Sequence, residues 1–454
     1  MRTTARVLGA VAAVTAIAFA LGCHGPAAEP EPQPAPAPGA QPAEPAAPVS
    51  EPRRPVEAPP PAEMQPRDNE PLVRVGLVVD RDSAAFSATG QFRVLDAGGG
   101  VLAVQDAGRT WTVRAGDGTG RLLLTRPDRT EPIALASPVQ VRTEQEGDFL
   151  LVAGRRYRGD LLLQRGTAGI TVVNRLPMEQ YLLSVVALEL GFRAPSDRQA
   201  VLAQAVAART YGVRYRGRRE ALGFDVFPTD ADQAYSGVES ELPEVVEAVR
   251  ATTGEILTWQ GQPIQALFHS TCGWSTEAAE QVFQNREAVP YLRPTSDRFG
   301  DGDRDFYCAL SPRFRWREEW DADGLNAMLS RSLPAILGGS TPFSGRVTDI
   351  RAGRMTPTGR VAELVVTTTS GSYTVGRVRE ALRTAAGGQL LSSMFQLYIT
   401  RDGDSVSRVV AAGAGYGHGV GMCQFGAVGR SRAGQDYRQI LATYYHGTTL
   451  ERSY

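Results

Sequence analysis

The chain has 454 residues and a formal net charge of −1, from 48 basic and 49 acidic residues. This even balance offers no basic surface for nucleic acid or for an anionic membrane, so we expect neither as a partner. The sequence contains no lysine, and all 48 basic residues are therefore arginine. The lack of lysine excludes Schiff-base chemistry and the phosphate-binding lysine of a P-loop. No G-x-G-x-x-G follows a strand-like run, and we expect no cofactor.

Residues 1–23 have the composition of an export signal. Two arginines precede an apolar stretch at 7–21, which is too short for a stable membrane span but typical of a signal peptide. The letters ALGC resemble a bacterial lipobox, which predicts lipidation of Cys23 and a lipoprotein of the cell envelope that faces the periplasm or cell wall. Cleavage after Ala20 is the alternative, and it would release a soluble exported protein. We expect the lipid to be the only membrane contact.

Composition divides the rest of the chain. Residues 24–71 are dominated by proline, alanine and glutamate, which predicts a disordered tether. Short apolar runs separated by glycine and aspartate turns predict a β-rich amino-terminal region at 72–173. Residues 174–454 mix helical and strand patterns, and we interpret 321–410 as a continuation of the same catalytic unit. The expected fold class is α+β, with a mixed α/β catalytic unit that contains a cleft.

A helix is predicted at 176–191, where Pro177 suits the first turn and Gly191 suits the stop. Its apolar face also carries Glu189 at the carboxyl end, beside Leu182, Val185 and Val186. Burial and the negative end of the helix dipole both disfavour the carboxylate, so both raise the carboxyl pKa. A carboxyl that stays protonated near neutral pH suits a general acid. The alternative is a glutamate that extends from the apolar face into water.

Two further segments carry polar side chains of interest. A second helix follows a capping box formed by Ser196 and Gln199. It places Gln204 and Tyr211 on one face and Arg209 on the neighbouring face, which suits either a scaffold or the lining of a sugar-binding cleft. The glycine-rich segment GYGHGVGMCQFGA contains His418 and Gln424, which can hydrogen-bond to hydroxyl or N-acetyl groups. The alternative for this segment is a structural turn with a satisfied histidine.

Several motifs, in their order along the chain, resemble the stage II sporulation protein D family (SpoIID), which includes the amidase-enhancer branch. They cover about residues 169–450 and read MEQYLLSVVALELG, AVLAQAVAARTYGV, DADQAYSG, TTGEILTWQGQPIQALFHSTCG, GYGHGVGMCQFGA and ILATYYHGTTL. The resemblance implies an exported bacterial protein that acts on peptidoglycan. It also matches Glu189 to the catalytic glutamate of the family.

The resemblance implies a lytic transglycosylase that cleaves glycan strands between N-acetylmuramic acid and N-acetylglucosamine and leaves 1,6-anhydromuramyl ends. Such an enzyme uses the 6-hydroxyl of the muramic acid as its nucleophile, so one carboxyl group can suffice. We assign the orientation of Glu189 or of the sugar to Gln204, Arg209 and Tyr211. We assign substrate binding or support of Glu189 to His418, and substrate binding to Gln424. The alternative function is a non-catalytic peptidoglycan-binding protein, or an activator of an N-acetylmuramoyl-L-alanine amidase as partner.

Beyond Cys23, the chain has three cysteines, an odd number for an oxidising compartment. We expect a disulfide between Cys272 and Cys308. The rival interpretation makes His269, Cys272 and Cys308 ligands of zinc, although their spacing matches no standard zinc module. We favour the disulfide and expect no metal.

Overall fold

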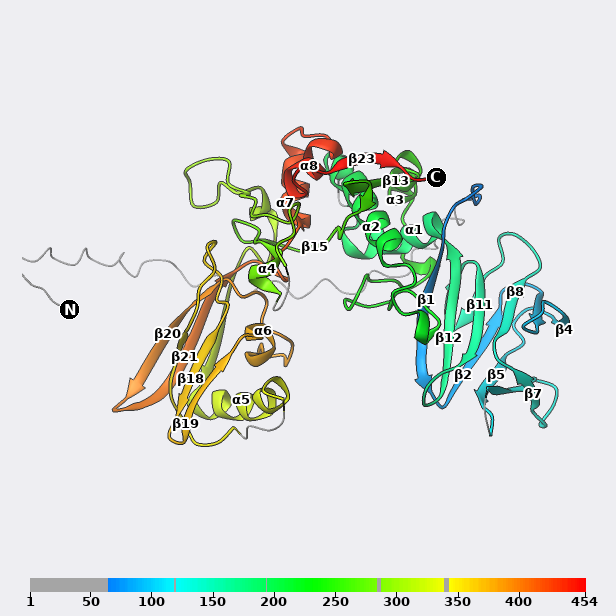
Figure 1. Ribbon diagram of the computed structural model, residues 1–454, viewed down its shortest axis with the longest axis horizontal. Coiled ribbons are helices and arrows are strands. Elements are labelled where there is room, and N and C mark those ends of the chain that lie inside the picture. The colour runs from blue at the N-terminus through cyan, green and yellow to red at the C-terminus, as the bar shows by residue number, and fades with distance from the viewer. Residues whose placement is uncertain (1–63, 118–119, 193, 284–286, 339–342) are drawn as a thin grey trace, which may run out of the picture. The chain divides into compact units, whose positions relative to one another are not determined.

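The computed structural model describes residues 64–454, apart from 118–119, 193, 284–286 and 339–342 (Figure 1). The predicted signal peptide with Cys23, and the predicted tether as far as residue 63, lie outside the described residues. Helices and strands are mixed in the remainder, with the strands concentrated first, which confirms the predicted α+β fold. Among the helices of this described part, none is long and apolar enough to cross a membrane.

The β-rich region forms two antiparallel sheets of six strands each. The first contains, in spatial order, β1 (Leu72–Arg81), β12 (Ile170–Pro177), β11 (Asp160–Arg165), β8 (Val139–Thr143), β3 (Phe92–Leu95) and β4 (Val101–Gln105). The second contains β10 (Arg155–Tyr157), β9 (Leu150–Val152), β2 (Ser83–Ala88), β5 (Trp111–Ala115), β6 (Arg121–Thr125) and β7 (Ile133–Ala136).

Alternating burial explains why these segments form sheets that share one core. Along β11, Leu161 and Leu163 are fully buried while their neighbours are partly exposed, and Val139 and Val141 of β8 follow the same rule. Strand β12 differs because five consecutive residues from Ile170 are buried. Both of its faces are therefore covered, and one covering contact is the hydrogen bond from the Tyr235 hydroxyl to Asn174 Oδ1 at 2.6 Å.

Helices follow directly from β12 and pack around α2, which is buried on nearly every side (Figure 1). This group contains α1 (Met178–Glu189), α2 (Arg198–Tyr215), α3 (Pro243–Ala251), α7 (Gln424–Arg432) and α8 (Tyr437–Tyr444), with the strands β13 (Glu255–Trp259), β14 (Gln262–Pro263) and β23 (Thr449–Arg452). The alanines of α2 let its neighbours approach closely on several sides. The predicted capping box is absent: a 3-10 turn, Pro195–Asp197, precedes α2, and no side chain caps its first turn.

A short parallel pair brings two distant segments together. Strand β15 (Phe268–His269) pairs with β22 (Met422–Cys423), so that His269 lies opposite Cys423. Strand β22 leads directly into α7, while α4 (Ala279–Val282) follows β15 along the chain. This pairing brings the segment that contains His269 beside the glycine-rich segment that contains His418.

The segment between these strands has a hydrophobic core of its own. Helix α5 (Ala322–Ile336) supplies Leu325, Leu329 and Leu333 to this core at helical spacing. The other elements are β16 (Arg315–Asp321), β17 (Val347–Ala352), β18 (Leu364–Thr368), β19 (Gly371–Val375), α6 (Val378–Ala381), β20 (Phe395–Asp402) and β21 (Ser405–Ala414). Its strands form two three-stranded sheets, β16-β21-β20 and β17-β18-β19.

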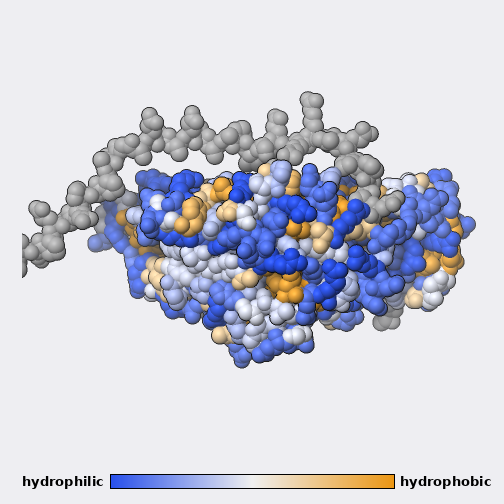
Figure 2. All heavy atoms as spheres, turned by 90° about the horizontal axis from the view of Figure 1, so that it is seen from above, coloured by the Kyte–Doolittle hydropathy of each residue, from blue (hydrophilic) through white to orange (hydrophobic). Residues whose placement is uncertain are grey.

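The face of the molecule drawn in Figure 2 is largely polar, and its apolar residues occur in small, separate groups. Several of the predicted site residues line a cleft of the molecule.

Candidate functional site

A cleft with a volume of about 840 Å³ contains Glu189 and most of the other predicted site residues. Its wall combines aromatic rings with ionisable groups. The aromatic residues are Tyr211, Tyr215, Phe268, Phe283, Tyr416 and Phe425. The ionisable residues include Glu189, Arg218, Asp230, Asp232, His269, Arg379 and His418. Aromatic faces beside hydrogen-bonding groups are what a sugar ring needs, because its C–H faces stack while its hydroxyls bond at the edges.

Glu189 is the last residue of α1, and the helix ends there because Gly191 turns the chain with a φ of 70°. The backbone N–H of Ala234 donates to Glu189 Oε1 at 2.8 Å, and Gln424 Nε2 donates to Oε2 at 3.4 Å. Burial raises the pKa of Glu189 above its ordinary value; these two hydrogen bonds oppose the rise, and the charge of Asp230 adds to it. The direction of the shift is the one that a general acid requires.

Gln424 reaches the carboxyl group because of the parallel pair. It follows β22 directly and is the first residue of α7, and its side chain is almost fully buried. The sequence predicted that Gln424 contacts the substrate, and the structure brings its side chain within hydrogen-bond distance of Glu189.

Tyr211 also lines the cleft, but its hydroxyl is already engaged. It donates to Asp232 Oδ1 at 2.9 Å, while Asp232 also accepts from the Phe227 N–H and pairs with Arg219 at 2.8 Å. The Tyr211 ring lies 4.4 Å from that of Tyr215, measured between centroids. Tyr211 therefore presents mainly an aromatic surface, and Asp232 is neutralised rather than available as a nucleophile.

Both ring nitrogens of His418 form hydrogen bonds with main-chain groups. Nε2 lies 2.9 Å from the Phe268 carbonyl oxygen, and Nδ1 accepts the Val420 N–H at 3.0 Å, which assigns the proton to Nε2. Glycine at position 421 lets the loop approach the neighbouring backbone this closely, because a Cβ there would lie 2.0 Å from the Leu267 carbonyl oxygen. His418 thus holds the glycine-rich loop against β15 and contributes its ring to the cleft wall.

His269 is a cleft residue that the sequence suggested only as a zinc ligand. It is 4% exposed, and its Nδ1 lies 3.2 Å from the Val420 carbonyl oxygen, so the ring carries its proton there. Burial lowers the pKa of His269 well below its ordinary value, which keeps the ring neutral. Its Nε2 has no hydrogen-bond partner among the described residues. A buried acceptor without a partner, in the wall of a cleft, is suited to accept a hydrogen bond from a hydroxyl or amide group of a ligand.

Two predicted site residues lie elsewhere. Arg209 is fully buried and donates to Glu179 from Nε at 2.8 Å and from Nη2 at 2.6 Å. Gln204 is also fully buried, and neither atom of its amide has a partner in the part of the chain that the structure describes. Neither residue lines the cleft, which α2 reaches only near its carboxyl end, through Tyr211 and Tyr215.

The expected disulfide between Cys272 and Cys308 is not formed in the structure. Cys272, Cys308 and Cys423 are free thiols, and the Sγ atoms of Cys272 and Cys308 lie 3.5 Å apart. An S–S bond would need about 2.05 Å. A third thiol, from Cys423, and the carboxyl group of Asp297 lie in the same buried cluster.

Comparisons with known protein families match two stretches of the chain, and each stretch contains residues of the cleft. The profile of the stage II sporulation protein family (SpoIID) matches residues 166–259, which include Glu189 and helices α1 to α3. A domain of unknown function (DUF8618) matches residues 296–421, which include the second core.

Alignments with individual proteins cover longer stretches of the chain than the family profiles do. The chain is 31% identical over 297 residues to stage II sporulation protein D of Bacillus subtilis, which covers 62% of this chain and 76% of that protein. It is 32% identical over 308 residues to an uncharacterized protein of Brachyspira hyodysenteriae, covering 67% and 74% respectively. It is also 32% identical over 285 residues to the amidase enhancer of Bacillus subtilis, covering 56% of this chain but only 38% of that protein.

Proposed function

Because this chain belongs to the stage II sporulation protein D family, we propose that it is an envelope enzyme that cleaves peptidoglycan glycan strands. The reaction is that of a lytic transglycosylase, with Glu189 as the acid and then the base. The observation that carries the proposal is the partly buried Glu189 carboxyl group, with its raised pKa, in the wall of an aromatic-lined cleft.

The proposed reaction needs one carboxyl group. Glu189 donates its proton to the glycosidic oxygen as the bond from that oxygen to the muramic acid C1 breaks. The 6-hydroxyl of the same muramic acid then bonds to C1 and gives its proton to the Glu189 carboxylate. This step restores the acid, consumes no water and leaves an anhydro ring.

The other carboxyl groups of the cleft support this assignment. Asp232 is paired with Arg219 and accepts from Tyr211, so its carboxyl group is already engaged by structural partners. Asp230 is exposed to solvent and acts on Glu189 through its charge. A hydrolase of the usual kind would need a second carboxyl group to activate water or to attack the sugar.

Around Glu189 the cleft offers complementary contacts for sugars. The rings of Tyr211 and Tyr215 provide a stacking surface, and we assign to His269 Nε2 the acceptance of a hydrogen bond from a sugar hydroxyl or N-acetyl group. Gln424 donates to the Glu189 carboxylate, so it supports the base form of the second step.

A second candidate function rests on one finding, the likeness to a protein named amidase enhancer. In that case the cleft binds glycan without cutting it, and the protein activates a peptidoglycan amidase. The two functions differ in whether the purified protein alone releases glycan fragments.

Substitution of Glu189 by glutamine separates the two functions. We expect wild-type protein to release fragments from purified peptidoglycan, either intact or stripped of stem peptides, and Glu189→Gln to lose about 10²–10⁴-fold in rate, as is typical when a general acid is removed. Soluble fragments are measured by chromatography and mass spectrometry. Glu247→Gln, on the exposed side of α3, is the matched control and should keep full activity.

Co-sedimentation with peptidoglycan completes the test. If wild-type protein binds both substrates but cleaves neither, the catalytic proposal is wrong. An increase in amidase activity on adding the wild-type protein would then establish the second function.

A further inference from the structure

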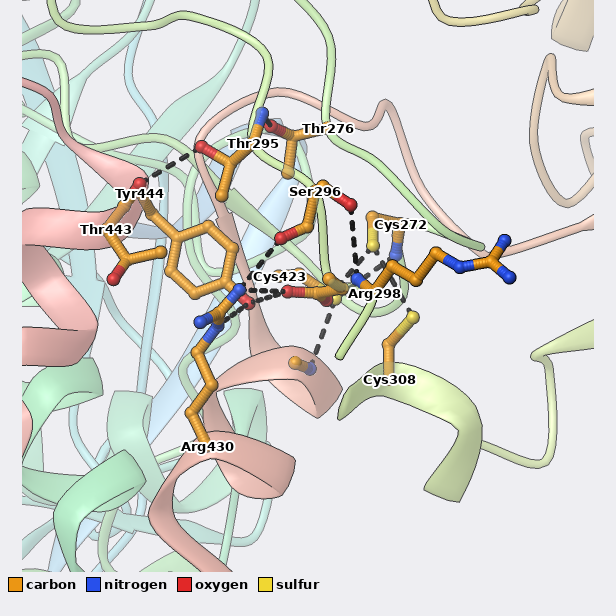
Figure 3. A network of polar contacts seen from close by, with 12 residues as sticks. Cys272, Thr276, Thr295, Ser296, Arg298, Cys308, Cys423, Arg430, Thr443 and Tyr444 are labelled. Atoms are coloured by element: carbon orange, nitrogen blue, oxygen red, sulfur yellow. Dashed lines mark hydrogen bonds and ion pairs between the residues drawn. The ribbon is translucent and has the colours of Figure 1, made fainter. Parts of the chain in front are cut away.

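Four potential metal ligands converge behind the wall of the cleft. One ligand atom from each of Cys272, Asp297, Cys308 and Cys423 can be chosen so that all four lie within 4.8 Å of one another. All four side chains have no exposed surface. Figure 3 shows the three thiols together, with Arg430 and Tyr444 in the same network. We propose that these four residues bind one structural Zn²⁺ ion.

The separations suit a tetrahedral zinc site. Zinc–thiolate bonds of about 2.3 Å place two sulfur ligands of a tetrahedron about 3.8 Å apart. The Cys272 and Cys308 Sγ atoms lie 3.5 Å apart, and Asp297 Oδ2 lies 3.1 Å from Cys272 Sγ. Three thiolates and one carboxylate form a closed set of four ligands, as in structural zinc sites, and the soft thiolates favour zinc over magnesium or calcium.

Hydrogen bonds orient the ligands from outside. Asp297 Oδ1 accepts from the Tyr444 hydroxyl at 2.6 Å and from Arg430 Nη2 at 3.1 Å, which leaves Oδ2 directed to the thiols. The Cys423 sulfur accepts the N–H groups of Cys272 at 3.1 Å and of Gly426 at 3.2 Å. Such outer partners fix the direction of a ligand and favour its anionic form, and they accompany most metal sites.

Glycine at position 426 makes room for this arrangement. A Cβ there would lie 2.1 Å from Asp297 Oδ2 and equally close to the Tyr444 hydroxyl. The helix that begins beside Cys423 can therefore approach Asp297 only because residue 426 has no side chain.

Charge balance gives independent support. Arg360 is 1% exposed and donates from Nη2 to the Cys272 carbonyl oxygen at 2.9 Å. Its Nε and Nη1 have no hydrogen-bond partner within the described residues. A buried guanidinium needs a nearby anion. A zinc ion with three thiolates and one carboxylate keeps two negative charges, which the two guanidinium groups of Arg360 and Arg430 balance.

A disulfide explains less of the pocket. It would use Cys272 and Cys308 only, and it would leave a buried thiol at Cys423 and a buried carboxyl group at Asp297 beside the bond. The rival zinc set includes His269, but among the described residues the converging ligand atoms come from three cysteines and Asp297, and the His269 ring lines the cleft instead. The four-residue set includes every ligand-type group of the cluster.

The zinc site lies directly behind the residues of the cleft. Cys272 follows β15, which carries His269, and Cys423 ends β22 and precedes Gln424. Cys308 belongs to the 3-10 turn Tyr307–Leu310, which packs on α7. Zinc would therefore join β15, β22 and this turn, and so fix the positions of His269 and Gln424. We infer a structural role, since four protein ligands leave no position for substrate.

Metal content is the first test. Full-length protein purified without chelators should contain one zinc ion per chain by plasma mass spectrometry. Cobalt-exchanged protein should show the intense thiolate-to-cobalt absorption of a three-sulfur site. Neither measurement depends on a variant that has to fold. Absence of metal, together with a Cys272–Cys308 disulfide in peptides from a non-reducing digest, would overturn the proposal.

Variants then test the ligand set. Cys308→Ser and Asp297→Asn should lower zinc content and melting temperature, whereas His269→Gln should keep a full equivalent of zinc. Loss of zinc from His269→Gln, with retention in Asp297→Asn, would instead establish the set with His269 and contradict the assignment. These readouts do not involve glycan cleavage, so their result is independent of the proposed enzyme activity.

Discussion

Glu189 has two hydrogen-bond donors and one acidic neighbour, and each shifts its acidity in a known direction. Burial makes the largest contribution and raises its pKa; the donors at Ala234 and Gln424 lower it, and the charge of Asp230 raises it. The first step of the proposed reaction needs the protonated form, so kcat/KM should fall as the pH rises through this pKa. The neighbours of Glu189 therefore control the alkaline side of the pH profile.

Two substitutions should move that alkaline limb in opposite directions. Gln424→Ala removes a donor to the carboxylate, which raises the pKa of Glu189 and moves the limb to higher pH. Asp230→Asn removes a negative charge, which lowers that pKa and moves the limb to lower pH. The measurement is kcat/KM for glycan cleavage across the pH range.

Asp404→Asn, in the exposed turn between β20 and β21, serves as the matched control and should leave the limb in place. If both cleft variants shift the limb in the same direction, or neither shifts it, Glu189 is not the group that titrates.

At the residue scale, sequence reasoning succeeded where one periodic pattern was enough. The helical spacing of Leu182, Val185 and Val186 put Glu189 at the end of a buried face, and Gly191 marked the stop. It could not foresee that Gln204 and Arg209 lie away from the cleft, because assigning a helix face requires knowing what covers the other faces. The role of His269 depends on which ring nitrogen meets Val420, and no local pattern contains that information.

A buried ion pair joins helices α1 and α2. Glu179 of α1 and Arg209 of α2 are bound by two hydrogen bonds, and Glu179 also accepts from the Gly254 N–H at 3.0 Å and the Tyr454 hydroxyl at 2.7 Å. The pair thus joins α1, α2 and the carboxyl end of the described chain. Its partners are all buried or nearly so, so either ion alone would be costly.

Arg209→Ala should therefore destabilise the fold without altering the cleft wall. Removal of one partner leaves Glu179 buried and unpaired, and we expect the free energy of unfolding to fall by about 3–5 kcal/mol. Urea denaturation followed by circular dichroism measures this loss.

The exposed pair of Arg377 and Glu380 provides the comparison. Arg377→Ala should cost at most about 1 kcal/mol, because water screens that pair. An equal loss in the two variants would show that the buried pair contributes no more than the exposed one.

At the scale of elements, local patterns predicted the β-rich region and the helices but not how they meet. The parallel pairing of β15 with β22 joins segments that are far apart in sequence, and each strand has only two residues. A strand this short has no detectable period. The convergence of three cysteines and Asp297 depends on that pairing, which is why the sequence suggested a disulfide instead.

The described residues contain two hydrophobic cores, and the lining of the cleft comes both from the SpoIID-matching part and from the segment with the second core. Glu189 and Tyr211 belong to the former, whereas Arg379 belongs to α6 of the latter. The sequence predicted the α+β class, but not the second core, since apolar strands and helices look alike whichever core they fill. The cleft therefore forms only when both parts of the chain are folded together.

The most direct test of the account is the mass of the glycan ends produced by wild-type protein in water enriched in heavy oxygen. Internal attack by the 6-hydroxyl uses no solvent oxygen. The account predicts anhydromuramyl ends that lack one water and carry no label, formed by wild-type protein and absent with Glu189→Gln. Labelled reducing ends would contradict it, because they would show that water attacks the sugar and that the enzyme is a hydrolase.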